Sequence, residues 1–310
     1  MIVDSNINLI HGESFYNELK AHGFVSSKIV FSAGESSKNL KIASNIFNAL
    51  IADNFTKSDI IIGLGGGVTL NLAGYTASNY LNGIPYIQIP TSYLSAIDNT
   101  FSCQYVLNQA EFKNVIGANY MPEFVAIDYK FFETLSEDSL LEGSITALRY
   151  ALLSDVNLIR HIYSHDFEYV VERCLSISKS LCTVDNQKTG LYHLLDFGNT
   201  VGHALESSEM FALSPGVALA YGLYFESLAA YKMNYTTTDI SSYIKEILVT
   251  LGLNIDSRLP LNNLFSFTSI DKKIFNDTLL IIVPDSIGRC HIHKVPLSDF
   301  HAYIDSISIG

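Results

Sequence analysis

Basic residues and long apolar runs are both scarce in this sequence, and each scarcity excludes a class of protein. The 19 Lys and Arg residues against 31 Asp and Glu give a net charge of −12, which excludes electrostatic binding to a nucleic-acid backbone. The longest apolar stretches, such as residues 217–225, are too short to span a membrane. Residues 1–20 contain polar and charged side chains and no secretory signal. We therefore expect a cytoplasmic protein with neither a nucleic-acid nor a membrane partner.

Cysteine is scarce too. The four cysteines form no C-x-x-C pair, which excludes a zinc knuckle and indicates reduced thiols. Two histidine pairs remain as metal candidates. His161 and His165 would share a helix face, and His291 and His293 would share a strand face. Neither pair has a third ligand at a recognised spacing, so we interpret all four as surface or packed histidines.

The sequence contains enough hydrophobic residues to form the cores of two domains. Its 310 residues are 48% hydrophobic and 16% charged, a composition typical of ordered globular proteins. The first part alternates strands with amphipathic helices, as in a parallel α/β sheet: strands at 28–31, 60–62 and 86–89, and helices at 37–53 and from 68. Longer helices follow, and then a hairpin: 139–153, 166–183, 190–205, 216–233 and 241–251, with strands 279–283 and 290–295. We predict an α/β domain over residues 1–134 and a mostly helical domain over residues 135–310.

A glycine-rich turn joins the strand at 60–62 to the next helix. It reads Gly63-Leu64-Gly65-Gly66-Gly67-Val68. Glycines at such a turn let backbone N–H groups approach a phosphate at the helix N-terminus. A tight strand-to-helix turn also needs glycine, and Val68 replaces the last glycine of the dinucleotide fingerprint. Taken alone, the turn leaves a phosphate site and a purely structural turn both open.

Further motifs accompany the turn in one order along the chain. They are AGESSK (33–38), GLGGGVTLNLAGY (63–75), IPYIQIPTSYLSAIDNT (84–100), FKNVIG (112–117), Glu142-Gly143, Arg149-Tyr150, DFGNTVGHALE (196–206) and SPGVALAYGL (214–223). From about residue 1 to residue 295 the chain resembles the dehydroquinate synthase family of sugar phosphate cyclases. The resemblance implies an N-terminal Rossmann-like NAD-binding domain and a mostly α-helical C-terminal domain. It also implies a reaction in which NAD and a divalent metal, usually zinc, convert a seven-carbon keto-acid phosphate into dehydroquinate with elimination of phosphate.

The chain departs from the family where the metal is bound. The resemblance implies a glutamate in A-E-V-I-K-Y, the first histidine of G-H-T-x-G-H and the histidine of H-G-E-A-V as ligands. The corresponding residues here are Thr146, Asn199 and Pro215. Proline has no side-chain ligand, and hydroxyl and amide oxygens bind zinc poorly beside imidazole and carboxylate. We therefore expect no zinc and name no metal ligand.

The substrate positions implied by the resemblance are altered as well. A carboxylate becomes Asn71, a lysine becomes Gln104, two arginines become Tyr192 and Asn82, and an asparagine becomes Asp196. These changes remove charge-assisted hydrogen bonds to carboxylate and phosphate, and Asp196 would repel such groups. A residual anion site is left, or else a set of capping and surface residues: Asn114, Arg149 in place of a lysine, Lys179, His203 and Lys273.

The cofactor positions are better kept. The residues that match the family around NAD are Gly34, Glu35, Lys38, Gly65, Gly66, Gly67, Asn71, Thr91, Ser92, Lys113 and Thr134. Glycine backbone and hydroxyl donors of this kind suit a pyrophosphate, and we expect weak NAD binding between the domains. The chain begins near the end of the family's first strand, without the extra hairpin, so we expect a changed sheet edge and adenine side.

Three kinds of function are compatible with these residues. The first is an inactive relative that serves as a binding or regulatory partner and still holds NAD. The second is an active dehydroquinate synthase-type cyclase with an altered site, and the third is a metal-independent, NAD-dependent oxidoreductase acting on a polyol or sugar phosphate. We favour the first, because a catalytic metal supplies several kcal/mol of transition-state stabilisation. The expected partners are a small phosphorylated ligand, a second copy in a homodimer, and a different protein in a heteromeric complex.

Overall fold

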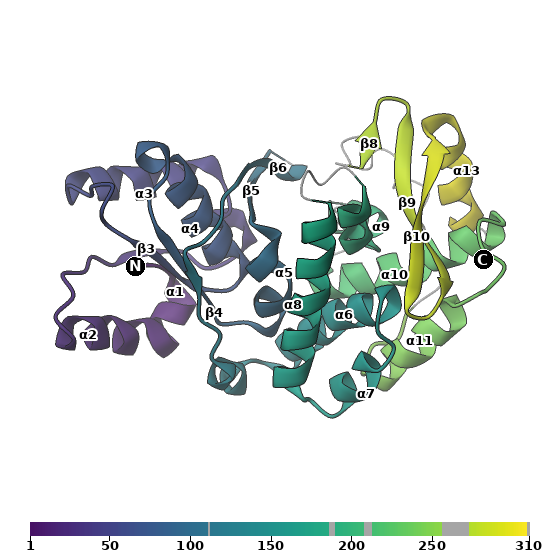
Figure 1. Ribbon diagram of the computed structural model, residues 1–310, viewed down its shortest axis with the longest axis horizontal. Helices are drawn as coiled ribbons and strands as arrows, with labels where there is room; N and C mark the ends of the chain where they lie inside the picture. Colours follow the sequence, from purple (N-terminus) through teal and green to yellow (C-terminus); the bar gives the residue numbers. More distant parts are fainter. Residues whose placement is uncertain (111, 186–189, 208–212, 256–272, 309–310) are drawn as a thin grey trace. The chain divides into compact units, whose positions relative to one another are not determined.

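The chain forms two compact units, Met1–Leu140 and Leu141–Gly310. The structure, a computed structural model, describes residues 1–110, 112–185, 190–207, 213–255 and 273–308 (Figure 1). The first unit is an α/β unit and the second is mostly helical, which confirms the predicted fold class. Among the described residues, no helix combines the length and the apolar character needed to cross a membrane.

A parallel sheet forms the centre of the N-terminal unit. Its strands lie in the order β2 (Ile29–Phe31), β1 (Ile2–Asp4), β3 (Ile61–Gly65), β4 (Tyr86–Pro90) and β7 (Phe124–Val125). Every neighbouring pair is parallel, as the alternation of strands and helices predicts. The first residues thus make a complete short strand that is paired on both sides, with β2 and with β3.

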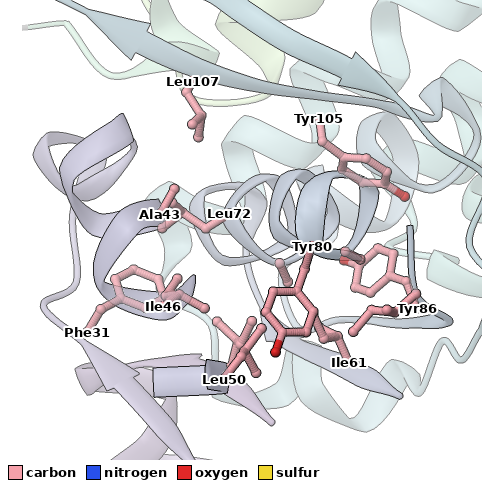
Figure 2. Packing of buried hydrophobic residues seen from close by; sticks show 14 residues of the cluster. Phe31, Ala43, Ile46, Leu50, Ile61, Leu72, Tyr80, Tyr86, Tyr105 and Leu107 are labelled. Carbon is pink, nitrogen blue, oxygen red and sulfur yellow. The ribbon is translucent and has the colours of Figure 1, made fainter. Parts of the chain in front are cut away.

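Helices cover both faces of this sheet because successive strand residues point to opposite sides. On one face, Ile2 packs with side chains of α3 (Leu40–Ala52) and α4 (Gly67–Asn79), and Figure 2 shows this core around Ile46, Leu72 and Tyr86. On the other face, Val3 packs near residues of α1 (Ser5–Ile7), α2 (Glu13–Ala21) and the 3-10 segment η4 (Tyr129–Thr134). A π-helical turn, η1 (Asn8–Gly12), links α1 to α2.

An antiparallel hairpin follows α5 (Tyr93–Ser102) and was not predicted from the sequence. Its strands are β5 (Gln104–Gln109) and β6 (Phe112–Asn119). The strands carry Gln, Asn and Lys between their apolar residues, so no apolar run marks them. Tyr105 fixes the hairpin to the core: its ring packs edge-to-face on Tyr86, and its hydroxyl donates a hydrogen bond to Gln88 Oε1 at 3.1 Å. A Cβ on Gly74 would lie 2.3 Å from that ring, so this close packing needs glycine.

The C-terminal unit is built around a long buried helix, α10 (Pro215–Lys232). The other helical segments are α6 (Glu137–Leu153), α7 (Leu158–Tyr163), α8 (Phe167–Val184), η5 (Leu191–Asp196), α9 (Asn199–Ser207), α11 (Ser241–Thr250) and α13 (Leu297–Ser308). A three-stranded antiparallel sheet, β8 (Ile274–Phe275), β9 (Thr278–Ser286) and β10 (Arg289–Pro296), contains the predicted hairpin, which is confirmed.

The prediction of one continuous helix over residues 190–205 is wrong. The segment splits into the 3-10 turns of η5 and the helix α9, because Gly198 adopts φ +83°, a left-handed conformation incompatible with a continuous helix. The break lets α9 approach α10 closely. A Cβ on Gly222 would lie 1.9 Å from the carbonyl oxygen of Gly198. The glycines of these two motifs are therefore required by helix packing, whatever chemistry accompanies them.

Candidate functional site

The glycine turn places the N-terminus of α4 beside polar side chains of α5. Gly65 ends β3 and Gly67 begins α4. A Cβ on Gly66 would lie 3.5 Å from Ser92 Oγ, and one on Gly67 would lie 3.3 Å from Asn99 Oδ1. Backbone N–H groups at such a helix end attract a phosphate. The sequence analysis missed Asn99, which no motif marks.

The surroundings of Thr91 are evidence that a polar ligand binds at this turn. Its backbone N–H donates to the Gly65 carbonyl at 3.0 Å. Its hydroxyl is buried, with 2% of the residue exposed, and has no hydrogen-bond partner among the described residues. Buried polar groups normally have a partner, so an orphaned hydroxyl beside the turn fits a bound polar group. The neighbouring Ser92 caps α5, accepting from the Ser95 backbone N–H at 3.3 Å.

Asn71 has a structural role that its family position does not reveal. Its Nδ2 donates to the Gly67 carbonyl at 2.8 Å, and its Oδ1 accepts from the Val106 N–H at 2.7 Å. The residue is 4% exposed. A carboxylate could accept from Val106 but could not donate to Gly67. The amide therefore joins the first turn of α4 to strand β5.

A second group of predicted cofactor residues is tied to the hairpin by Asn108. Lys38 is buried; its Nζ donates to Asn114 Oδ1 at 2.6 Å and lies 3.7 Å from Glu35 Oε1. Asn108 Nδ2 donates to Glu35 Oε1 at 2.8 Å, while Asn108 Oδ1 accepts from the Asn114 N–H at 3.0 Å. The structure thus brings Glu35, Lys38 and Asn114 together. Asn114 has φ +59° and is exposed, and sequence reasoning missed Asn108.

The remaining cofactor candidates lie elsewhere in the N-terminal unit. Gly34 adopts φ +114° immediately before Glu35 and is exposed, and Lys113 is half-buried on β6. Thr134 is exposed, and its hydroxyl contacts His11 Nε2 at 3.1 Å and the Phe131 carbonyl at 2.9 Å. Their cofactor roles stay predictions.

Asp4 is a further polar residue at the carboxyl end of a strand that sequence reasoning missed. Its Oδ1 accepts from the backbone N–H groups of Asn6 and Ile7, and its Oδ2 accepts from the Thr69 hydroxyl at 3.0 Å. The carboxylate caps α1 and ties it to α4. The strand signal Met1 to Asp4 ends in an N-cap residue, which is the feature that could have identified it.

In the C-terminal unit, the positions of the expected metal ligands are occupied by groups with other partners. Thr146 lies in α6, and its hydroxyl donates to the Glu142 carbonyl at 3.0 Å. Asn199 begins α9; its Oδ1 accepts from the Arg149 guanidinium at 3.3 Å and its Nδ2 donates to Asp196 Oδ1 at 3.2 Å. Pro215 is the exposed first residue of α10.

These groups do not fit a divalent metal. One of the three side chains has no ligand atom, and the second directs its hydroxyl hydrogen at its own helix. The third shares its oxygen with a guanidinium cation, which would repel a dication. Among the described residues, no three side chains of His, Cys, Asp or Glu are grouped as a metal site.

Buried charges of both signs surround the start of α9. Arg149 is 3% exposed and Lys273 1%. Asp196 Oδ2 lies 3.1 Å from His193 Nδ1, and the Asp196 carbonyl accepts from Lys273 Nζ at 3.5 Å. Both carboxylate oxygens of Asp196 have partners within the fold, and its repulsion of an anionic ligand stays a prediction.

Glu226 of α10 completes this arrangement. Its Oε2 accepts from the Gly198 N–H at 3.1 Å and its Oε1 from the Val201 N–H at 3.0 Å. The residue is 2% exposed. A carboxylate at a helix N-terminus is stabilised by the exposed N–H groups and the helix dipole. Two N–H groups at the start of α9, those of Gly198 and Val201, are thus used internally.

The other predicted anion-site residues differ in their surroundings. His203 is half-buried one turn beyond Asn199 on α9, whereas Lys179 is exposed on α8. Tyr192 is buried, and its N–H donates to Asp185 Oδ2 at 3.0 Å. Arg149 contacts Asn199 and Lys273 contacts the Asp196 carbonyl, so both cations bond to the segment at the start of α9. Asn114 belongs to the N-terminal unit, and a shared anion site of the five residues stays a prediction.

Of the departures in the N-terminal unit, Asn82 is exposed with φ +60° and Gln104 is half-buried.

Several solved structures share the fold of this chain. One is 2-deoxy-scyllo-inosose synthase, solved with carbaglucose-6-phosphate, NAD+ and Co2+ (TM-score 0.85, 22% identity, covering 100% of this chain and 89% of that chain). Another is 2-epi-5-epi-valiolone synthase from Streptomyces hygroscopicus with NAD+ and Zn2+ (TM-score 0.87, 21% identity, 99% and 89% covered). An iron-containing alcohol dehydrogenase is more distant (TM-score 0.61, 15% identity, 99% and 90% covered). At these identities the likeness defines the fold.

Sequence comparison defines the family. The family model of the 3-dehydroquinate synthase N-terminal region matches residues 28–142, and that of the C-terminal region matches residues 128–274. The 3-dehydroquinate synthase of Clostridium acetobutylicum is 32% identical over 315 residues, covering 98% of this chain and 88% of the relative. That of Streptococcus agalactiae is 32% identical over 316 residues, covering 98% and 89%. The chain belongs to the 3-dehydroquinate synthase family.

Proposed function

We propose that this chain is a member of the family that binds NAD but does not carry out metal-dependent cyclisation, and that it acts as a binding or regulatory protein. The observation that carries the proposal is the state of Thr146, Asn199 and Pro215, whose side chains are bonded within the fold or offer no ligand. A site with a guanidinium contact in place of an imidazole ligand has no group that would polarise a hydroxyl as a metal does.

NAD fits the N-terminal unit better than a metal fits the C-terminal one. Gly66 and Gly67 leave the N-terminus of α4 without a Cβ that would block a pyrophosphate, and Thr91 has a buried hydroxyl in need of a partner. Glu35 follows strand β2, and its carboxylate can accept hydrogen bonds from ribose hydroxyls, as acidic residues do in dinucleotide-binding folds. When bound, NAD would supply hydride transfer. Two proteins of this fold are described as NAD+ complexes, which supports the assignment.

The proposal is tested by calorimetric titration of NAD together with elemental analysis of the purified protein. We expect NAD binding without stoichiometric zinc, cobalt or manganese. About one metal ion per chain, lost when Asn199 and Thr146 are both replaced by alanine, would contradict it. Gly66→Asp should abolish NAD binding, because a carboxylate would face the phosphate. Gly23→Asp adds the same carboxylate at a surface position whose φ of +86° costs some stability, and it should leave NAD binding intact.

An active cyclase is the second candidate, and a specific observation favours it. The relatives named 3-dehydroquinate synthase match 98% of the chain at 32% identity, and His203 and Lys273 lie in the described C-terminal unit. An assay of phosphate release from the family's keto-acid phosphate, with NAD and with or without zinc, separates the candidates. We expect no release. Robust NAD-dependent release that is abolished by His203→Ala would establish the cyclase.

The same assay addresses a metal-independent oxidoreductase and the effect of restoring the ligands. An oxidoreductase acting on a polyol or sugar phosphate would form NADH without releasing phosphate. The triple variant Thr146→Glu, Asn199→His and Pro215→His should bind zinc more tightly than the wild type but remain inactive, because Gln104 and Tyr192 still lack the cations of the family. Homodimer formation and a heteromeric partner remain predictions, which sedimentation of the purified chain and affinity capture would test.

A further inference from the structure

Asn108 connects two segments that the proposed NAD site needs. Its side-chain amide donates to the Glu35 carboxylate at 2.8 Å and accepts from the Asn114 N–H at 3.0 Å. Its backbone N–H donates to the Lys38 carbonyl at 2.8 Å. One residue of strand β5 thus holds the loop after β2 at two points, Glu35 and Lys38, and strand β6 at a third, Asn114.

The same strand also holds the glycine turn. Two residues before Asn108, the Val106 N–H donates to Asn71 in the second turn of α4. Strand β5 is therefore hydrogen-bonded both to the helix that begins at the glycine turn and to the carboxylate that would bind ribose.

The amide also competes with Lys38 for the Glu35 carboxylate, since both groups lie against the same oxygen. Lys38 Nζ lies 3.7 Å from Glu35 Oε1 but donates to Asn114 Oδ1 at the shorter distance of 2.6 Å. If the tether from Asn108 were lost, Glu35 would be able to turn toward the ammonium. A carboxylate turned toward the ammonium has fewer acceptor positions left for ribose hydroxyls, and it repels a 2′-phosphate less.

We infer that Asn108 is a positioning residue of the nucleotide site, which holds Glu35 so that a dinucleotide with a free ribose 2′-hydroxyl binds in preference to one carrying a 2′-phosphate. The inference rests on the proposed binding of NAD. Asn108 acts through Glu35 and contacts no nucleotide atom itself.

The test compares two asparagine-to-aspartate changes in the same hairpin. Asn108→Asp keeps an acceptor for the Asn114 N–H but places a carboxylate against Glu35, while Asn119→Asp changes an exposed residue at the end of β6. Binding of NAD and of NADP is measured by calorimetry for each variant. In Asn108→Asp we expect NAD to weaken about tenfold and NADP to change less than twofold, so that the preference falls about tenfold. Asn119→Asp should keep both affinities.

A double variant shows whether the effect passes through Glu35. In a Glu35→Gln background, adding Asn108→Asp should change the NAD to NADP preference no further, because the carboxylate that Asn108 positions is gone. If Asn108→Asp does not fold, Asn108→Ser, which is too short to reach Glu35, replaces it with the same expectation.

Each outcome bears on a different statement. Equal weakening of both nucleotides in Asn108→Asp would mean that the residue only supports the hairpin, and would overturn the inference while leaving NAD binding in place. A wild-type protein that binds neither nucleotide at millimolar concentration would overturn the proposed function and, with it, this inference.

Discussion

Replacing Asn71 by aspartate should destabilise the N-terminal unit, although the resemblance implies a carboxylate at this position. The amide donates to the Gly67 carbonyl at 2.8 Å and accepts from Val106 at 2.7 Å in a residue that is 4% exposed. Aspartate keeps the second bond and replaces the first with two oxygens facing each other. Loss of a buried hydrogen bond costs about 1 kcal/mol, and an uncompensated buried charge adds more. We expect a total of about 2–4 kcal/mol at pH 8, or roughly 10 °C in Tm.

The pH dependence identifies the cause. The pKa of the introduced carboxyl would be raised in the folded state, because burial and the Gly67 carbonyl both oppose its charge. A group whose folded pKa is raised contributes its stability below its unfolded pKa of about 4, and that contribution is lost as pH rises through the folded value. The stability difference between Asn71→Asp and wild type should therefore be small below about pH 4, grow as pH rises from there through the folded pKa, and be constant above it.

Thermal unfolding without nucleotide, measured for both proteins at each pH, provides the assay. Asn71→Ala serves as the control, since it removes both hydrogen bonds without adding a charge and should lose a similar amount of stability at every pH. An Asn71→Asp protein as stable as the wild type at pH 8, or a loss that does not vary with pH, would refute this account of Asn71.

Three further predictions concern the C-terminal unit. Gly222→Ala should cost more than about 4 kcal/mol of unfolding free energy, or prevent folding, because its Cβ would meet a carbonyl oxygen at 1.9 Å. The control Gly252→Ala, with φ +92° and open space, should cost only about 1 kcal/mol. Chemical denaturation measures both. Glu226→Gln should lose about 2–3 kcal/mol in the same assay, since an amide can accept only one of the two N–H bonds that cap α9. Burial, and secondarily His291, lowers the pKa of His293 below 6.5, so the free energy of unfolding should fall as pH drops below that value. His291→Gln should raise the midpoint of His293 in an NMR titration. An unchanged midpoint would contradict the coupling between the two histidines.

Much of the fold could be predicted from short-range patterns. Apolar strands such as 60–62 and the helix at 37–53 carry a clear period, and the structure has β3 and α3 there. The hairpin of β5 and β6 could not be predicted, because it is held by contacts between residues that are far apart in the sequence. Tyr105 donates a hydrogen bond to Gln88, and the Val106 N–H donates to Asn71. The break at Gly198 was missed for a similar reason, since only the approach of α10 requires it.

The candidate site was predictable in its residue types but not in its contacts. Motif positions identified Glu35, Lys38 and Asn114, and the structure brings them together. The residue that joins them, Asn108, lies in a stretch without any local signal, and its hydrogen bonds reach 73 residues back along the chain. Likewise, comparison with the family pattern identifies Asp196 only as an added negative charge. It does not reveal that the carboxylate is hydrogen-bonded to Asn199 and His193.

The contact between Gly222 and the carbonyl of Gly198 has a consequence for how such motifs are used to infer activity. These glycines are needed for two helices to touch, so a lineage can exchange every reactive side chain around them and still be obliged to keep the glycines. A motif match at these glycines therefore indicates that the two helices pack in this way, and it does not indicate activity. Evidence for an enzyme has to come from the side chains between the glycines, which helix packing leaves free to change.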